Sequence, residues 1–266
     1  MISNLKPVGA IGRIWRKPKR LTVATARVPA GDRVYAIGDL HGRVDLLQRL
    51  HAKIAEDAET AAPGTRNTII YLGDYVDRGF NSKELIDFLL DHPLPGFAPV
   101  YLKGNHDEYF VNFIESAEDG GPWLKYGGDA TVYSYGVRIS EDVPPDQRLD
   151  HIRGRLRETV PARHMAFLSR LKLAWTVGDF LFVHAGVHPD RPWDQQVSHD
   201  LLWIRDQFLE SGRDFGKIVV HGHSVTEAPD VRVNRIGIDT GACYSNVLTC
   251  LVLEADSKRF LSTIDS

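Results

Sequence analysis

Cysteine is scarce in this chain of 266 residues, and long apolar runs are missing. The two cysteines, Cys243 and Cys250, have no zinc-like spacing and are too few for the disulfide framework of a secreted domain, so we interpret both as buried thiols. No run approaches the roughly 18 apolar residues that a bilayer-spanning helix requires, and no apolar signal region follows the N-terminal charges. We therefore expect a cytoplasmic protein with one elaborated domain, at a length near the limit for a single hydrophobic core.

Acidic residues are absent from the first twenty positions, which hold six basic residues. The remainder carries 26 basic and 35 acidic residues, a net charge of −9, and this disfavours nucleic acid as a partner. The basic segment, which includes Trp15, could contact an anionic membrane. Prolines and glycines interrupt any helix in it, so we favour a disordered tail over residues 1–32, followed by the folded domain over residues 33–266.

Three consecutive segments have the pattern of a strand, a polar turn and a helix, which is typical of a mainly parallel sheet. The apolar runs predict strands at residues 34–37, 68–72 and 100–102. The helices that follow are expected over residues 46–54, from Asn81 up to Pro93, and over residues 109–114. Asn81 and Glu84 form a capping-box pattern at the start of the second helix.

The chain changes character after about residue 118. Glycine and proline pairs separate short polar and helical pieces, and we expect residues 118–165 to be an insertion, acting as a lid. Beyond it, Gly178 and Asp179 form a two-residue hairpin signal between two apolar runs. Strands are expected at residues 173–177, 180–183, 218–220, 231–233 and 247–253, so the second half is richer in strands than in helices.

Polar blocks follow the three N-terminal strands. They read Gly-Asp-Leu-His-Gly at residues 38–42, Gly-Asp-Tyr-Val-Asp-Arg-Gly at 73–79 and Gly-Asn-His-Asp at 104–107. Each supplies metal-ligand types where a strand ends, at one edge of the sheet. The candidate ligands are Asp39, His41, Asp74 and Asn105. A single aspartate or histidine of this kind is more often a cap or a surface group, but three blocks in order predict a site for two metal ions.

The ligand types restrict the metal. Carboxylate, amide and imidazole groups suit Mn or Fe, with Zn as an alternative, and the absence of thiolates argues against a structural zinc. Two divalent cations bring a charge of +4, of which Asp39 and Asp74 neutralise only two units. The surplus favours hydroxide and a phosphate dianion, as an in-line displacement at phosphorus requires.

Two shorter motifs complete the pattern: His-Ala-Gly at residues 184–186 and Gly-His-Ser at residues 222–224. With them, the sequence resembles the serine/threonine phosphoprotein phosphatase (PPP) family of the calcineurin-like metallophosphoesterases, in its bacterial and phage-like branch. The resemblance extends over about residues 35–253, with five motifs in the family's order. It implies an α/β metallophosphatase fold, a four-layer α/β/β/α sandwich of two mixed sheets with flanking helices.

The resemblance also implies a ligand set. One metal would be held by Asp39 and His41, Asp74 would bridge both metals, and Asn105, His184 and His223 would complete the second. His221, two residues before His223, is interpreted as a strand-end residue. The remaining histidines have no motif around them and are interpreted as surface groups; they are His51, His92, His151, His164, His188 and His199.

The resemblance further implies which groups act on the phosphate. His106 would protonate the leaving alkoxide, and Asp77 would orient its imidazole. A carboxylate partner raises the pKa of a histidine, which suits the imidazole to general-acid duty near neutral pH. Arg78 presents a planar fork for two phosphate oxygens, and Arg205 matches a second phosphate-binding arginine of the phage-like branch.

Two positions depart from the family's pattern. Lys103 and Asp107 stand where the family often has arginine and glutamate, and a lysine lacks the bidentate fork, so no phosphate contact is assigned to it. Residues 238–244 resemble bacterial members and lack the longer signature of the eukaryotic catalytic subunits. We therefore expect no binding to eukaryotic regulatory subunits.

We expect hydrolysis of phosphate monoesters by a metal-bridging hydroxide, acting on phosphoserine or phosphothreonine in proteins. A symmetrically cleaving diadenosine tetraphosphate hydrolase shares the motifs and is the alternative, which exclusive release of ADP would identify. An inactive scaffold that binds phosphorylated partners is a different class. The presence of every expected ligand, and of both Asp77 and His106, opposes it. The substrate, the native metal pair and the oligomeric state stay open.

Overall fold

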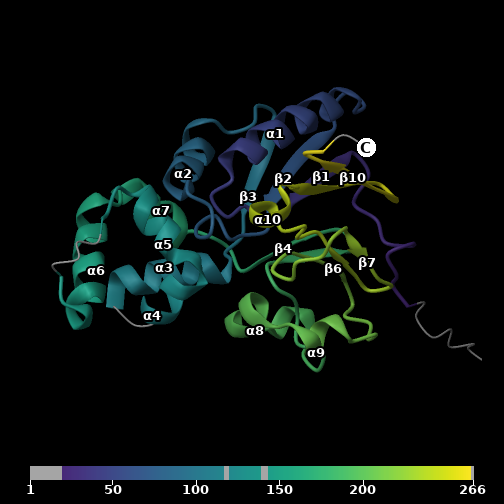
Figure 1. Ribbon diagram of the computed structural model, residues 1–266. Helices are drawn as coiled ribbons and strands as arrows, with labels where there is room; N and C mark the ends of the chain where they lie inside the picture. Colours follow the sequence, from purple (N-terminus) through teal and green to yellow (C-terminus); the bar gives the residue numbers. More distant parts are fainter. Residues whose placement is uncertain (1–19, 117–119, 139–142, 265–266) are drawn as a thin grey trace, which may run out of the picture.

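The computed structural model describes residues 20–116, 120–138 and 143–264. Within them, two five-stranded mixed sheets pack face to face, with helices on both outer faces (Figure 1). The first sheet has the order β10 (Ser257–Ser262), β9 (Thr249–Glu254), β1 (Asp32–Ile37), β2 (Arg66–Tyr71), β3 (Phe97–Tyr101). The second has the order β4 (Ala174–Val177), β5 (Phe180–Val183), β6 (Ile218–His221), β8 (Arg235–Gly237), β7 (Asp230–Val231). This arrangement confirms the expected four-layer α/β fold.

Each sheet contains three neighbouring parallel strands. β1, β2 and β3 run parallel in the first sheet, and β5, β6 and β8 run parallel in the second. The predicted hairpin at Gly178 and Asp179 is confirmed, since β4 pairs antiparallel with β5. β8 and β10 were not predicted, because short segments rich in charged residues do not have a strand-like apolar pattern.

Residues of the central strands are apolar on both faces, as strands buried in a sandwich require. Val34 and Ala36 pack in the core between the sheets, whereas Tyr35 and Ile37 pack under the outer helices. The helices over the first sheet are α1 (Val44–Glu59) and α2 (Ser82–Asp91), and those under the second are α8 (Ser198–Trp203) and α9 (Asp206–Leu209). A short helix, α10 (Ala242–Ser245), precedes β9. α2 begins where the capping pattern predicts, although Asn81 makes no side-chain cap bond.

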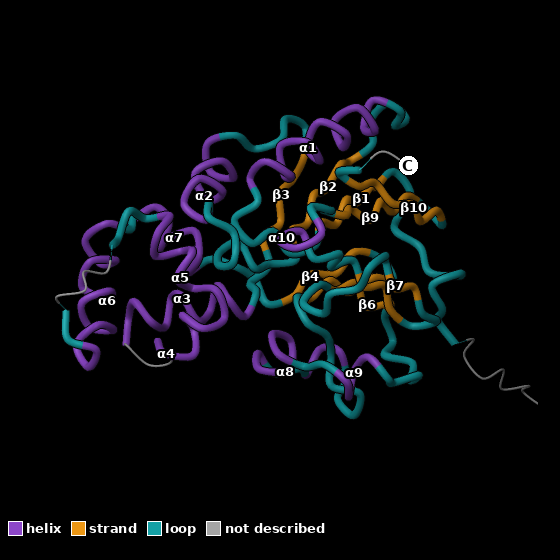
Figure 2. The backbone as a smooth tube through the Cα atoms, viewed as in Figure 1, coloured by secondary structure: helices purple, strands orange, loops and turns teal. Residues whose placement is uncertain are grey.

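A helical lobe lies beside the sheets (Figures 1 and 2). We define it as α3 (Asn105–Ser116), α4 (Gly120–Trp123), α5 (Asp129–Ser134), α6 (Arg148–Thr159) and α7 (Ala162–Ser169), with a π-helical turn (Leu124–Gly128) and a 3-10 turn (Pro145–Gln147). The described part of the expected insertion is therefore helical. None of the helices in the described ranges combines the length and apolar character needed to cross a bilayer.

Residues 20–32, the described part of the expected tail, are ordered against the sheets, and Asp32 already begins β1. Ala26 and Val28 are buried in the core between the sheets, and the Val28 N–H donates to Ala255 O at 3.0 Å. The expected boundary of the tail is corrected accordingly, because its last residues cover apolar surface that the sheets would otherwise expose. Residues 1–19 lie outside the described residues.

Two histidines that the sequence placed on the surface are buried, at 5% exposure for His51 and 0% for His164. His51 lies on the apolar face of α1, and its Nε2 is 2.9 Å from Tyr71 Oη. His164 Nδ1 is 2.9 Å from Tyr135 Oη, at the base of the lobe. The tyrosine hydroxyls satisfy imidazoles that helical spacing directs inward. Burial lowers the pKa of His51 to about 4.

We predict that His51 makes stability depend on pH. Its folded pKa of about 4 lies below its ordinary value, so the unfolded chain binds a proton that the folded chain does not. The contribution of His51 to the free energy of unfolding is complete above about pH 6.5. It is lost as pH falls, by roughly 2 kcal/mol at pH 5. Urea unfolding at pH 8 and pH 5 should show this additional loss in the wild type relative to His51→Gln, and equal losses would contradict the prediction.

Candidate active site

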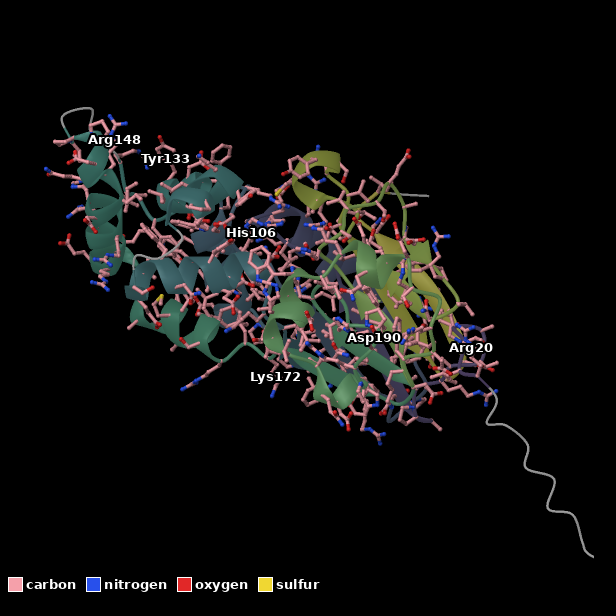
Figure 3. All side chains as sticks on the ribbon, turned by 90° about the horizontal axis from the view of Figure 1, so that it is seen from below. Arg20, His106, Tyr133, Arg148, Lys172 and Asp190 are labelled. Carbon is pink, nitrogen blue, oxygen red and sulfur yellow. The ribbon has the colours of Figure 1, made fainter. Side chains whose placement is uncertain are left out.

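The predicted ligands come from the carboxyl ends of five strands. Asp39 and His41 follow β1, Asp74 follows β2, Asn105 follows β3, His184 follows β5 and His223 follows β6. Parallel strands bring these ends to one edge, where all six side chains are buried. Figure 3 shows the adjacent His106 where the helical lobe meets the sheets.

Left-handed backbone conformations concentrate at this edge. The non-glycine residues with φ between 42° and 73° there are His41, Asp74, Asp77, Arg78 and His223. Each such conformation costs about 1–3 kcal/mol and persists only where the surroundings enforce it. Close approach adds a second constraint, since a Cβ on Gly104 would lie 1.9 Å from Asp74 Oδ1. The tight turns therefore serve to bring the polar side chains together.

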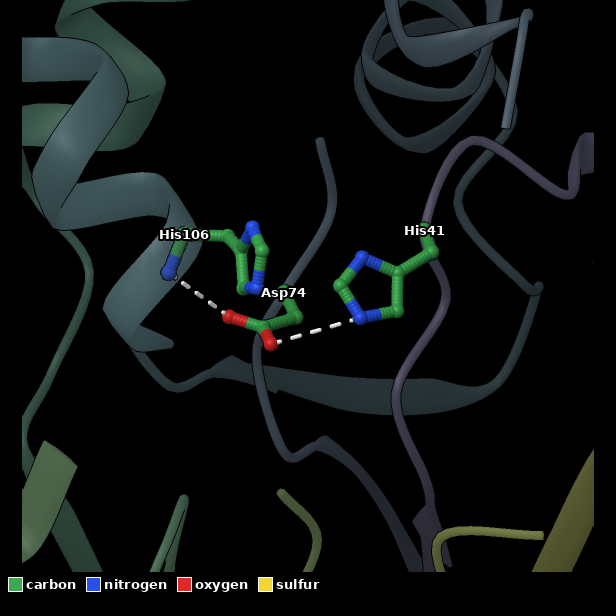
Figure 4. A group of neighbouring side chains, drawn as sticks. All are labelled: His41, Asp74 and His106. Carbon is green, nitrogen blue, oxygen red and sulfur yellow. Dashed lines mark hydrogen bonds and ion pairs between the residues drawn. The ribbon is translucent and has the colours of Figure 1, made fainter. Parts of the chain in front are cut away.

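Two groups of three candidate ligands share Asp74. The first is His41, Asp74 and His106 (Figure 4), and the second is Asp74, His184 and His223; within each group the ligand atoms lie within 4.8 Å of one another. In the first, Asp74 Oδ2 lies 3.4 Å from His41 Nε2, and Asp74 Oδ1 accepts from the backbone N–H of His106 at 3.0 Å. A carboxylate shared by two groups has the placement that a bridging ligand needs.

Asp39 lies beside these groups rather than in them. Its carboxylate accepts from the backbone N–H of His223 at 3.1 Å. Burial raises the pKa of Asp39 well above its ordinary value, and the carboxylates of Asp239 and Asp74 raise it further. The first group thus contains His106 where the resemblance places Asp39.

Lone pairs converge in the second group. His184 Nδ1 donates to Leu72 O at 2.9 Å, and burial lowers the pKa of His184, so its Nε2 carries only a lone pair. That Nε2 lies 2.9 Å from Asn105 Oδ1 and 3.5 Å from Asp74 Oδ2, which are acceptors as well. His223 Nδ1 lies 2.9 Å from the same Asn105 Oδ1, and its Nε2 is buried with no hydrogen-bond partner among the described residues. Facing acceptors of this kind are satisfied by a cation, so these residues fit a divalent metal.

The protonation states also suit metal binding. Burial lowers the pKa of His41 to about 3 and that of His223 to about 2, so both imidazoles are neutral at neutral pH. His41 Nδ1 donates to Val76 O at 2.9 Å, which leaves its Nε2 directed toward Asp74.

His106 and Asp77 form a buried pair. His106 Nδ1 donates to Asp77 Oδ2 at 2.7 Å. Burial lowers the pKa of His106, but the carboxylates of Asp74 and Asp77 outweigh this and raise the pKa above its ordinary value. The remaining ring nitrogen, Nε2, lies 3.1 Å from Arg78 Nη2, which can only donate, so Nε2 is the atom that would carry the proton of a general acid once Arg78 bonds to phosphate.

A cavity of about 230 Å³ lies beside His106, and both predicted phosphate-binding arginines line it. Arg78 Nη1 donates to His41 Nε2 at 2.9 Å, and Arg205 Nη1 donates to His223 O at 3.4 Å. The lining residues are Arg78, Asn105, His106, Tyr109, Tyr126, Trp203 and Arg205. A larger hollow of about 360 Å³ between α2 and α7 shares none of them and lies away from both ligand groups.

Two acidic residues at the site were not predicted. Asp107 Oδ2 accepts from the backbone N–H groups of Asp74 at 3.0 Å and Gly104 at 2.9 Å, and burial, then Asp74, raises its pKa to about 8. Asp239 is buried beside Asp39, and its Oδ2 has no partner among the described residues. Both residues lie in motifs that were identified from the sequence, at residues 104–107 and 238–244. Their position in these motifs could therefore have indicated that they lie at the site.

Two residues of the helical lobe were also not predicted. Trp123 Nε1 donates to Asp77 Oδ2 at 2.8 Å, and Thr131 Oγ1 donates to Asp77 Oδ1 at 2.7 Å. No local pattern marks either residue, because their role depends on how the lobe packs against the strand ends.

A sequence model described as calcineurin-like phosphoesterase matches residues 32–241. The chain belongs to this family. A relative named bis(5'-nucleosyl)-tetraphosphatase PrpE (asymmetrical), from Bacillus anthracis, is 25% identical over 234 residues, which cover 81% of this chain and 88% of the relative.

Two solved structures share the fold of this phosphoesterase. One is a candidate diadenosine tetraphosphatase, with a TM-score of 0.57 and 20% identity, and the match covers 91% of this chain and 100% of the other. The other is a protein serine/threonine phosphatase of Saccharomyces cerevisiae with similarity to human phosphatase PP5. Its TM-score is 0.51 at 15% identity, over 89% and 81% of the two chains. At these identities the structures establish the fold alone.

Membership makes this phosphoesterase a hydrolase that acts on phosphoesters with divalent metals. The ligand groups around Asp74 agree with that chemistry. The six expected metal ligands are buried at this edge, and Asp107, Asp239, Trp123 and Thr131 are buried with them.

We predict that Asp74→Asn abolishes binding of both metals, because one carboxylate belongs to both ligand groups. The affinity should fall more than about 100-fold, beyond the loss typical of an outer-shell partner. Metal content after desalting measures this, with circular dichroism as the test of folding. Asp45→Asn, the same change beside Arg43 on the surface, is the matched control and should keep its metals. Two tightly bound equivalents in Asp74→Asn would contradict the assignment.

Proposed function

We propose that this phosphoesterase hydrolyses phosphate monoesters with an alkoxide leaving group, and that phosphoserine and phosphothreonine in proteins are its substrates. The buried pair of His106 and Asp77, 2.7 Å apart beside a cavity with two arginines, carries the proposal. An alkoxide leaves poorly without a proton, and a general acid contributes roughly 100-fold to 10,000-fold to such a step.

The metal ligands in this proposal are Asp39, His41, Asp74, Asn105, His184 and His223. When bound, two divalent cations supply Lewis-acid charge and a water nucleophile at neutral pH. Mn or Fe suits this donor set, with Zn as the alternative, because it combines oxygen and imidazole ligands without thiolates. The facing acceptors of His184, Asn105 and Asp74 support the assignment.

The remaining groups act on the substrate. The guanidinium groups of Arg78 and Arg205 bind phosphate oxygens, since each is a planar donor that lines the cavity. Arg78 would exchange its bond to His41 for one to phosphate. His106 keeps its Nδ1 proton on Asp77 and gives its Nε2 proton to the leaving oxygen as the bond to phosphorus breaks.

Nucleoside polyphosphates are the second candidate substrates. The curated relative at 25% identity is named a tetraphosphatase, and exposed aromatic residues lie at the site. Tyr126, 59% exposed, lines the cavity, and Tyr244, 68% exposed, has the Arg78 guanidinium 5.9 Å from its ring centre. Exposed aromatic faces suit stacking with nucleobases. An inactive scaffold is disfavoured, because the acid pair and both ligand groups are present together.

We predict that the metal-loaded protein releases phosphate from a phosphoserine peptide faster than it cleaves diadenosine tetraphosphate. Phosphate release and nucleotide chromatography at equal substrate concentrations measure the two rates. ADP alone from the dinucleotide would indicate symmetrical cleavage, and ATP with AMP would indicate asymmetrical cleavage. Turnover of the dinucleotide with none of the phosphopeptide would contradict the proposal in favour of the second candidate.

We predict that His106→Asn keeps two metals and loses roughly 100-fold to 10,000-fold of the turnover of an alkyl phosphate, because it removes the proton donor. Metal analysis and initial rates are measured on the same preparation. His92→Asn, a change at an exposed histidine, is the control and should keep full turnover. Because His106 belongs geometrically to the first ligand group, loss of one metal equivalent from His106→Asn would instead make it a ligand.

A further inference from the structure

The carboxylate of Asp77 accepts three side-chain hydrogen bonds in a fully buried position. Oδ2 accepts from His106 Nδ1 at 2.7 Å and from Trp123 Nε1 at 2.8 Å. Oδ1 accepts from Thr131 Oγ1 at 2.7 Å, and the Asp77 N–H donates to that same hydroxyl at 2.7 Å. The two additional partners come from α4 and α5 of the helical lobe, whereas His106 lies at the start of α3, which follows β3.

Packing holds both lobe residues in place. Trp123 and Thr131 are fully buried. The Trp123 ring lies 5.0 Å from the Phe113 ring, and a Cβ on Gly128 would approach the indole to 2.3 Å. Close packing on both sides leaves the indole one orientation, in which its N–H meets Asp77.

The same part of the lobe also holds Arg78. The Arg78 N–H donates to Gly127 O at 2.9 Å. Gly127 has a φ of 105°, and a Cβ there would lie 2.8 Å from Arg78 Cγ, so the turn between α4 and α5 requires glycine. One turn of the lobe therefore contacts both the partner of the general acid and a phosphate-binding arginine.

We infer that Trp123 and Thr131 are positioning residues that act through Asp77 to aim the His106 imidazole at the leaving oxygen. The inference rests on the function proposed above, in which His106 is the acid. A carboxylate with one donor can rotate about its bond to Cβ, whereas donors on both oxygens leave it one orientation. The lobe, which we expected to act as a lid, therefore supplies the residues that position the general acid.

The positioned His106 donates one proton in the step that releases the leaving group. As the bond between phosphorus and the leaving oxygen breaks, its electron pair stays on that oxygen, which takes the His106 Nε2 proton. His106 becomes neutral and keeps its Nδ1 proton on Asp77. An alkoxide depends on this proton, whereas dinitrophenolate is stable as an anion and leaves without it.

The leaving-group dependence provides the test. Thr131→Val removes the hydroxyl at nearly constant shape, and Trp123→Phe removes the indole N–H. Turnover of a phosphoserine peptide and of 2,4-dinitrophenyl phosphate is measured with protein that holds two manganese equivalents. We expect each variant to lose about tenfold or more on the phosphopeptide and less than about threefold on the aryl ester. Thr131→Ser, which restores the hydroxyl, should recover most of the phosphopeptide rate.

Tyr135→Phe is the matched structural control. It removes a buried hydroxyl of the same lobe, bonded to His164 and not to Asp77. Any loss in this variant should be equal on the two substrates. Unfolding midpoints and metal content of all variants distinguish a loss of positioning from a loss of stability or of metal. If Thr131→Val does not fold, Trp123→Phe still tests the inference.

Equal losses on both substrates, or no loss on the phosphopeptide, would overturn the inference while the wild-type turnover leaves the proposed function standing. Failure of the serine variant to recover the rate would also count against it. A wild type that holds two metals and turns over neither ester would overturn the proposed function, and this inference with it.

Discussion

Burial of the Asp74 carboxylate is the constraint on which the site depends. The side chain is 1% exposed, its backbone has a φ of 51°, and Asp107 fixes its N–H. A buried charge is costly unless charged or polar partners surround it, and here the His106 backbone N–H donates to one carboxylate oxygen while ring nitrogens of His41 and His184 lie near the other. Because the neighbouring atoms are mostly acceptors, the arrangement is complete only with cations, which agrees with the metal-dependent chemistry of the family.

Asp77 is a second buried carboxylate, and it connects two parts of the molecule that differ in construction. The proposed metal ligands follow strands of the two sheets, whereas Trp123 and Thr131, which donate to Asp77, lie on α4 and α5 of the helical lobe. In the proposed function, rigid strand ends hold the ligands to a fixed geometry, and the packed lobe holds the partner of the acid. Both parts must then be assembled before a phosphate meets the metal ions and a proton donor together.

Fold and family membership establish a hydrolase of phosphoesters but leave the leaving group undecided, since one fold accommodates many substrates. The parts of the site that distinguish a phosphoprotein from a nucleotide lie around the cavity. In the proposed function Arg78 and Arg205 bind the phosphate, whereas Tyr126 and Trp203, which line the same cavity, would contact the group attached to it. Tyr126, which lines this cavity and is 59% exposed, is compatible with either group.

Local patterns in the chain predicted the four-layer fold, and they marked the polar residues that lie buried together at the strand ends. Apolar runs and the polar residues that follow them are local patterns, and parallel strands necessarily gather their ends. The sequence did not predict that residues 20–32 pack, that His51 and His164 are buried, or that β8 and β10 form. Tertiary structure alone decided that Trp123 and Thr131 hold Asp77, and that Asp239 faces Asp39, because these contacts join segments far apart in the chain. Local spacing carries no information about such pairs; they are determined by which surfaces pack together.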